Sequence, residues 1–229
     1  NEVENSITQE TSACFEPALD YVALKFPRWD LQKFQQVSTH LGSEMKSVGE
    51  VMSLGRSFEE VLQKAIRMLD VGLKGFVCNN LNFIDLDKEL SQPTDKRIFA
   101  IAVALHQGYS INKIHQLTKI TPWFLYKMKN IVVSELKLKQ KSLQELDFTL
   151  MREAKQNGFS DQQIAELVSS TESEVRQKRK SIGVLPVVKQ IDTMAAEYPA
   201  QTNYLYLTYH GNEHDISVKE KNQIAVIGS

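Results

Sequence analysis

The chain has 229 residues, of which 42% are hydrophobic and 24% charged; this is a globular composition and excludes disordered, collagen-like and disulfide-based classes. The 27 Lys and Arg nearly balance the 28 Asp and Glu, so the net charge of -1 excludes a global positive field for a phosphate backbone. Cys14 and Cys78 lie far apart without a metal-ligand spacing, so we expect free thiols in a reducing compartment.

The sequence also predicts no contact with a membrane. The longest apolar run, Ile98–Leu105, is far shorter than the roughly 18 to 20 residues that cross a bilayer. The first ten residues are polar and acidic, without the hydrophobic segment of a secretion signal. Because the chain starts with Asn and stops in an apolar stretch just before Ser229, we expect both ends to be cuts in a longer, cytoplasmic protein.

The first 70 residues predict a short α+β segment. Aromatic and branched residues over Phe15–Phe26, closed by Pro27, predict a strand that forms half of a hairpin. A loop with Gly42, Gly49 and Gly55 is expected next. The capping box Ser57–Glu60 then predicts the start of an amphipathic helix that continues to about Leu69.

The middle of the chain predicts one helix after another. A polar linker between Gly75 and Pro93 carries the apolar residues Phe83 and Ile84 and leads into this helical region. Serine, threonine, proline and glycine mark the helix ends. We expect helices over Arg97–His106, Ile111–Thr118 and Pro122 to about Lys139, and further helix starts at the capping boxes Ser142–Glu145, Ser160–Gln163 and Thr171–Glu174, with Gly108, Gly158 and Gly183 as stops.

A weak internal repeat lies in this region, because Gly108–Thr121 and Gly158–Thr171 match at a constant offset of 50 residues. Each copy predicts a short helix, a tight turn and a second helix. Beyond it, Tyr204–Tyr209 and Gln223–Ile227 predict strands. The predicted fold class is therefore mainly α: an all-helical central domain with a short α+β segment before it and a β-strand after it.

Two helix-turn-helix units leave open an independent DNA-binding or protein-binding module, since the second helix of such a unit can enter a major groove. Basic residues do cluster at Arg176–Lys180. However, Arg152–Lys189 holds seven basic and five acidic residues, and Glu172 and Glu174 would face the phosphates. We therefore expect no nucleic-acid partner.

No residue pattern predicts catalysis or a bound metal or cofactor within these residues. His210 and His214 have acidic neighbours, but Gly211 and Asn212 between them would break the helix needed to align two ligands. Lys46 and Glu50 stand in an apolar segment that we expect to be buried. A buried carboxylate must be paired or must face an internal water-filled space, and the sequence leaves both alternatives open.

Six stretches resemble the large (synthetase) chain of carbamoyl-phosphate synthase. Their residues are most similar to those of the eukaryotic multifunctional pyrimidine-pathway form. They span nearly the whole chain, so the resemblance is far more specific than a short motif. They are Phe15–Tyr21, Pro27–Phe34, Met45–Arg56, Trp123–Met128, Gly158–Ile164 and Lys189–Tyr206.

The resemblance implies a ligase that makes carbamoyl phosphate from bicarbonate and ammonia or glutamine, with ATP, Mg²⁺ and K⁺ as cofactors of the parent enzyme. Residues 1–70 would end the first ATP-grasp half, 71–214 form the helical oligomerization domain, and 215–229 begin the second half. Positions matching Glu50 and Leu19 line a carbamate tunnel in that family. The implied partners are the rest of the synthetase chain, a glutamine amidotransferase and further copies of the enzyme.

The family's nucleotide loops and magnesium ligands would lie outside residues 1–229. We therefore expect this chain alone to be catalytically inactive. The implied localisation is cytoplasmic, or mitochondrial for a urea-cycle form, and the residues do not distinguish pyrimidine, arginine and urea synthesis.

Overall fold

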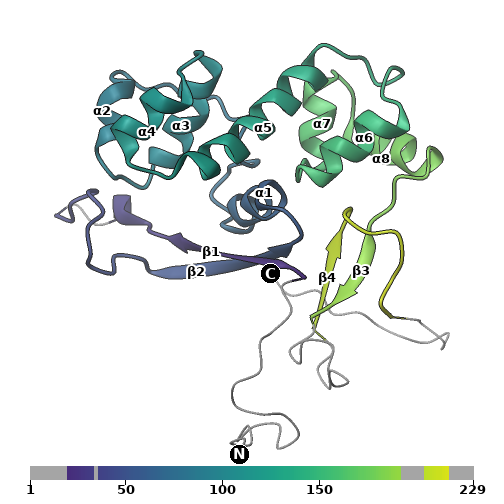
Figure 1. The fold of residues 1–229 in the computed structure, drawn as a ribbon, viewed down its shortest axis with the longest axis horizontal. Helices are drawn as coiled ribbons and strands as arrows, with labels where there is room; N and C mark the ends of the chain where they lie inside the picture. Colours follow the sequence, from purple (N-terminus) through teal and green to yellow (C-terminus); the bar gives the residue numbers. More distant parts are fainter. Residues whose placement is uncertain (1–19, 34–35, 192–203, 217–229) are drawn as a thin grey trace, which may run out of the picture.

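The computed structural model describes residues 20–33, 36–191 and 204–216, which form a mainly helical structure with two small antiparallel sheets (Figure 1). The predicted fold class is confirmed. In chain order the elements are β1 (Val22–Arg28), the 3-10 turn η1 (Leu31–Lys33), β2 (Gly49–Gly55), α1 (Phe58–Met68), α2 (Leu86–Ser91), α3 (Arg97–His106), α4 (Ile111–Thr118), α5 (Pro122–Lys139), α6 (Phe148–Gln156), α7 (Asp161–Leu167), α8 (Glu172–Ser181), β3 (Val187–Gln190) and β4 (Leu205–Thr208).

The internal repeat forms two matched three-helix units, α3–α5 and α6–α8, and the long helix α5 runs from the first toward the second (Figure 1). In each unit a glycine with positive φ ends the first helix, Gly108 at 80° and Gly158 at 82°. A serine then caps the next helix: Ser110 Oγ accepts from Lys113 N, and Ser160 Oγ accepts from Gln163 N, both at 3.1 Å. The sequence offset is therefore a structural repeat.

The caps predicted most helix ends because they act within one turn. Helices α3, α4 and α5 have the expected bounds, and α7 and α8 begin with complete capping boxes at Ser160 and Thr171. The expected helix start at Ser142–Glu145 is wrong. Glu145 there accepts from Ser142 N at 2.8 Å in an isolated turn, and the next helix, α6, is capped by Asp147.

The predicted loop at Gly49–Gly55 is also wrong, because this stretch is strand β2. It pairs antiparallel with β1 from Val22↔Gly55 to Arg28↔Gly49. Pro27 lies inside β1 and does not end it. Among the described residues β1 pairs with β2 alone, so a proline lacking an N–H is tolerated there. Helix α2 and strand β3 were not predicted, whereas β4 lies in the predicted strand Tyr204–Tyr209.

One hydrophobic core runs through all the helices and includes the inner face of the hairpin through Phe26. Helix α1 lies between the β1–β2 hairpin and the helical units and packs against β1, β2, α5 and α6 (Figure 1). Its apolar side chains Val61, Leu62, Ala65 and Ile66 are all at most 2% exposed. This position makes α1 the element on which the sheets and the helices meet.

Candidate functional site

Helix α1 buries charged and polar side chains as well as apolar ones. Its N-cap Ser57 accepts from Glu60 N, as the predicted capping box requires. The second half of that box is absent, because the Glu60 carboxylate accepts from Arg56 N at 2.9 Å instead of from Ser57 N. Glu60 is 1% exposed and Gln63 is fully buried, so each must find partners inside the protein.

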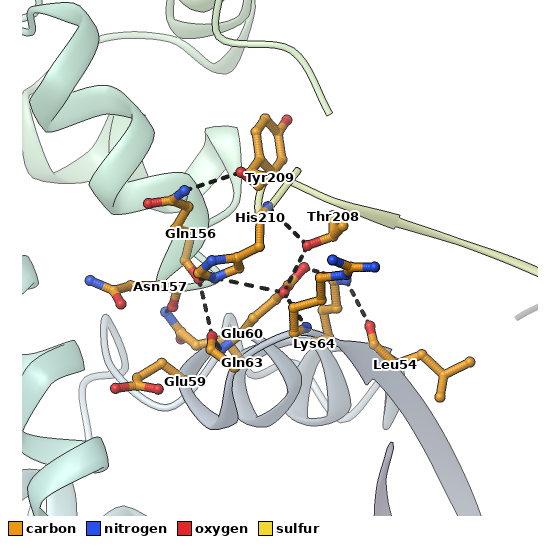
Figure 2. A network of polar contacts seen from close by, with 12 residues as sticks. Leu54, Glu59, Glu60, Gln63, Lys64, Gln156, Asn157, Thr208, Tyr209 and His210 are labelled. Atoms are coloured by element: carbon orange, nitrogen blue, oxygen red, sulfur yellow. Dashed lines mark hydrogen bonds and ion pairs between the residues drawn. The ribbon is translucent and has the colours of Figure 1, made fainter. Parts of the chain in front are cut away.

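Glu60 and Lys64 form the centre of a junction between three segments, which we call the α1 junction (Figure 2). Lys64 Nζ lies 2.7 Å from Glu60 Oε1, and it also donates to the carbonyl oxygens of Leu54 in β2, at 2.8 Å, and Leu207 in β4, at 2.7 Å. An ammonium group has three donors, and these three acceptors satisfy all of them. One side chain thus joins the hairpin, α1 and β4.

The other Glu60 oxygen completes the contact with β4. Thr208 Oγ1 donates to Glu60 Oε2 at 3.0 Å and accepts from His210 N at 3.1 Å. His210 Nε2 lies 2.9 Å from the Gln156 carbonyl oxygen at the end of α6, which requires the ring proton on Nε2 (Figure 2). The segment after β4 is therefore fixed to both α1 and α6.

A second part of the junction binds α1 to the start of α7. Gln63 Oε1 accepts from Phe76 N at 3.0 Å and from Gln163 Nε2 at 3.2 Å. Arg67 donates to the Gly158 carbonyl at 2.9 Å and to Gln163 Oε1 at 3.1 Å. Burial lowers the pKa of Arg67 to about 10. These bonds join backbone, amide and guanidinium groups, so this part of the junction positions segments and offers no nucleophile or base to a substrate.

Sequence reasoning did not find this junction, although its acid–base spacing at i, i+4 is visible in Glu60 and Lys64. That spacing is common on exposed helix faces. The pair is unusual because Glu60 is buried and β4 contacts Lys64, and no local sequence pattern predicts either feature.

The structure does not bury Glu50 as we expected. Glu50 lies on the outer face of the hairpin, where its side chain is 53% exposed and contacts Lys25 Nζ at 2.9 Å. In β2 the inward positions are Val51, Ser53 and Gly55, so the alternation of the strand turns Glu50 outward. Lys46 is not paired with it and donates to the His40 carbonyl at 2.7 Å. Leu19 lies outside the described residues.

Two of the four basic residues in the α8 cluster are engaged with carboxylates of the protein itself. Arg179 is 7% exposed and donates to both carboxylate oxygens of Asp161, at 3.1 to 3.3 Å. Lys155 Nζ donates to Asp161 at 2.8 Å, and Arg176 approaches the same carboxylate at 3.6 Å. These contacts hold Arg176 and Arg179 on the protein, which argues against the helix-turn-helix alternative.

Lys155, Asp161 and Arg179 form a buried triad, and their surroundings shift the pKa values of Lys155 and Asp161. Burial lowers the pKa of Lys155 to about 8, although Asp161 opposes the shift. Burial alone would raise the pKa of Asp161, but Lys155 and Arg179 outweigh it and hold that pKa below its ordinary value. In the first repeat the matching positions are the buried apolar residues Leu105 and Ile111, so the second unit carries an ion pair where the first has hydrophobic packing.

The histidines do not assemble a metal site. The His214 ring accepts from Val188 N at 3.0 Å, while His210 contacts Gln156 as described above. Within residues 20–33, 36–191 and 204–216, no group of three His, Cys, Asp or Glu side chains could hold a metal ion. Among the same residues, no helix combines the length and apolar character needed to cross a bilayer.

Comparison with known families gives a match over more than half of the chain. Residues 50–183 match the family model described as carbamoyl-phosphate synthetase large chain, oligomerisation domain. The matched range begins in β2, contains α1 and ends after α8. It therefore includes the Glu60–Lys64 pair.

Curated proteins resemble the chain along its whole length. It is 52% identical over 229 residues to the multifunctional protein ura1 of Schizosaccharomyces pombe, covering 100% of this chain and 10% of that protein. It is 53% identical over 228 residues to the multifunctional protein CAD of Squalus acanthias, covering 99% and 10%. It is 51% identical over 230 residues to the mitochondrial arginine-specific carbamoyl phosphate synthase large chain of Neurospora crassa, covering 100% and 19%. The chain thus spans only about a tenth to a fifth of these relatives.

Proposed function

The chain belongs to the carbamoyl-phosphate synthetase large-chain family, and we propose that it joins the two ATP-grasp halves of an enzyme that makes carbamoyl phosphate. The reaction proposed for the whole enzyme is the ATP-dependent synthesis of carbamoyl phosphate from bicarbonate and ammonia or glutamine. In this proposal residues 1–70 end the first half, 71–214 form the helical domain and 215–229 begin the second half.

The observation that carries the proposal is the α1 junction. Lys64 binds the Leu54 carbonyl in the segment assigned to the first half, and the Leu207 carbonyl shortly before the segment assigned to the second. Glu60 binds Thr208 in the same place. A segment that connects two catalytic halves must transmit their relative position, and charge-assisted hydrogen bonds do this with defined geometry.

ATP, Mg²⁺ and K⁺ are proposed as cofactors of the parent enzyme only. Among the described residues, no group of three or more His, Cys, Asp or Glu side chains could hold a metal ion. The proposal therefore gives these residues no part in binding the cofactors. The proposed partners are the rest of the synthetase chain, a glutamine amidotransferase and further copies of the enzyme. We propose a cytoplasmic location if the parent enzyme is of the multifunctional form. A mitochondrial location is the alternative, since a relative from Neurospora crassa is named as mitochondrial.

The junction is tested in the full-length enzyme with Lys64→Met. We expect carbamoyl phosphate formation to fall at least about fivefold while bicarbonate-dependent ATP consumption changes less than about twofold, because the catalytic groups of the first half are untouched. Lys137→Met, which removes an exposed ion pair with Glu153, is the control. Unchanged rates in Lys64→Met would contradict the proposed connecting role.

Glu50 and Leu19 are proposed to line the passage for carbamate, with Leu19 resting on the family resemblance alone. The exposed position of Glu50, with only the exposed Lys25 as ion-pair partner among the described residues, leaves its carboxylate available to a water-filled passage completed by other parts of the enzyme.

In the full-length enzyme Glu50→Lys should retain bicarbonate-dependent ATP consumption but form less carbamoyl phosphate, so that ATP consumed per product rises. Breaking an exposed pair costs only about 0 to 1 kcal/mol, so stability should barely change. Lys25→Met removes the same ion pair and keeps the carboxylate, and is the matched control. An unchanged ratio in Glu50→Lys would remove the tunnel assignment.

Self-association through the linker after α1 is proposed from its exposed apolar residues. The Ile84 side chain is fully exposed, and it borders a groove of about 630 Å³ whose apolar walls include Trp29, Leu73 and Phe83. Sedimentation of the full-length enzyme should show weaker association for Ile84→Glu and no change for Leu185→Glu, which alters an exposed apolar residue in the segment after α8. Equal association of the two variants would exclude this surface.

A further inference from the structure

Helix α5 carries large apolar side chains on two opposite faces. One face packs into the core and includes Leu125, Ile131 and Leu138, which are fully buried. The other face includes Tyr126 and Val133, which are 56% and 39% exposed. A helix that is hydrophobic all round is normally covered on both sides. The residues that the structure describes leave this second face open, so its cover comes from elsewhere.

The exposed face has the spacing of a helix-packing seam. Tyr126, Val133 and Leu136 are seven and three residues apart, as at the a and d positions of a heptad, and Lys129 occupies the d position between the first two. We call these four exposed residues the α5 seam. At 1.5 Å per residue the seam is about 15 Å long, so about three turns of a second helix would cover it.

An aromatic cluster extends the seam at the start of α5. The rings of Phe58, Trp123 and Phe124 lie edge to face, with centroids 5.0 to 5.9 Å apart. Trp123 is 53% exposed and stands three residues before Tyr126, so the two side chains are neighbours on the helix surface. Trp and Tyr are enriched among the residues that dominate binding energy at protein interfaces. The seam and the cluster together therefore have the composition of a docking surface.

The charges around the seam indicate the chemistry of its partner. Lys129 is exposed and has no ion-pair partner among the residues that the structure describes. Lys137, at the edge of the same face, is already paired with Glu153 at 2.9 Å. The only acid of α5, Glu135, is buried on the opposite side. A partner that carries a carboxylate is complementary to this face, whereas the α5 of a second copy would bring only further lysines.

We propose that the α5 seam docks an amphipathic helix, which places apolar side chains on Tyr126, Val133 and Leu136 and a carboxylate on Lys129. We assign this helix to the same polypeptide, outside residues 1–229, because the matched residues make up only 10 to 19% of the relatives. The assignment rests on the proposed function only in taking the chain as part of a longer synthetase. It does not depend on the α1 junction.

Hydroxyl-radical footprinting compares the accessibility of Tyr126 in the full-length enzyme and in the 229-residue chain. We expect Tyr126 to be oxidised at least about fivefold more slowly in the full-length enzyme, because the core of an interface is packed like a protein interior. A reporter peptide added to both samples corrects for the radical dose. Equal oxidation rates would overturn the proposal. This readout involves no enzyme activity, so its failure is distinct from a failure of the connecting role tested with Lys64→Met.

Carbodiimide cross-linking of the full-length enzyme identifies the acid that faces Lys129. We expect an amide between Lys129 and an Asp or Glu of the same polypeptide outside residues 1–229, located by mass spectrometry. Lys119→Gln removes an exposed lysine just before α5 and should leave this cross-link unchanged. In a mixture of isotope-labelled and unlabelled enzyme, a Lys129 cross-link between the two forms would show that a second copy covers the seam and would refute the assignment. Absence of any Lys129 cross-link would contradict an acidic partner.

Charge reversal tests the same pairing without a cross-linker. Lys129→Glu would place a carboxylate against the carboxylate of the partner, and we expect it to raise oxidation of Tyr126 in the full-length enzyme at least about threefold. Lys129→Met keeps the apolar stem and removes only the charge, so its effect should be smaller. Because Lys129 is exposed, neither change should alter the circular dichroism of the 229-residue chain. Full protection of Tyr126 in Lys129→Glu would exclude an acid opposite Lys129.

Discussion

Lys64 Nζ donates to the carbonyl oxygen of Leu207 at 2.7 Å, although 143 positions separate the two residues in the chain. The same ammonium group contacts Glu60 and Leu54, so β2, α1 and β4 share one charged atom. This contact makes the tail of the described chain part of the same folded unit as its beginning, and it is the basis for the connecting role proposed above.

Removal of this contact should destabilise the 229-residue chain. Lys64→Met leaves the buried Glu60 with Thr208 and Arg56 N as donors but without its cation. Because hydrogen bonds to charged groups contribute about 1.5 to 3 kcal/mol, we expect a loss of this size in the free energy of unfolding by urea. The exposed pair Lys137–Glu153 is the control, and Lys137→Met should change stability by less than about 1 kcal/mol. Equal losses in the two variants would indicate that the α1 junction contributes no more to stability than an exposed ion pair.

The two repeat glycines provide a matched comparison. Gly108 and Gly158 have the same φ, at 80° and 82°, so alanine at either position meets a backbone cost of about 1 kcal/mol. A Cβ at Gly108 meets nothing within 4 Å, but a Cβ at Gly158 would lie 2.9 Å from Gln63 Cβ and 3.0 Å from the Glu60 backbone. Gly158→Ala should therefore cost about 1 to 3 kcal/mol more than Gly108→Ala, measured by the same unfolding titration. Similar losses of unfolding free energy in the two variants would show that the end of α6 is not closely packed against α1.

The buried triad should respond differently to loss of its acid and loss of one base. Asp161→Leu leaves Lys155 and Arg179 buried without a carboxylate, and breaking a buried pair in this way costs about 3 to 5 kcal/mol. Lys155→Leu leaves Asp161 paired with Arg179 and introduces the residue that the first repeat has at Leu105. We expect its stability to stay within about 1 kcal/mol of wild type. Thermal unfolding of the two variants checks this, and comparable losses would contradict it.

Stability should also rise with pH in the alkaline range because of Lys155. Its pKa is lowered to about 8 in the folded chain, against about 10.4 when unfolded, so the unfolded state binds more protons between these values. The free energy of unfolding then increases with pH, by at most about 1.4 kcal/mol per unit. Subtracting the profile of Lys155→Leu removes other groups, such as Arg67. A flat difference between pH 8 and 10 would mean that the Lys155 pKa is not lowered.

The helical class and most helix ends could be predicted from the sequence, because caps and stops act over three or four residues. Ser110, Ser160 and Thr171 bond to the backbone three residues ahead, and this relation can be seen in the chain without knowledge of its fold. The repeat can also be seen in the sequence, because each copy carries its own stop glycine and cap serine. The same logic fails at Ser142, where the capping pattern is present but the helix starts only after Asp147.

Strand β2, the burial of charges and the α1 junction depend on contacts between distant parts of the chain and could not be predicted from the sequence. Gly49–Gly55 looks like a loop because glycines stand at both ends, and it becomes a strand only by pairing with β1. Glu50 appears buried from its apolar neighbours, yet the register of that pairing turns it outward. Glu60 and Asp161 are buried because the fold brings Thr208 onto Glu60 and brings Lys155 and Arg179 onto Asp161, and these side chains supply the hydrogen bonds that water would otherwise give.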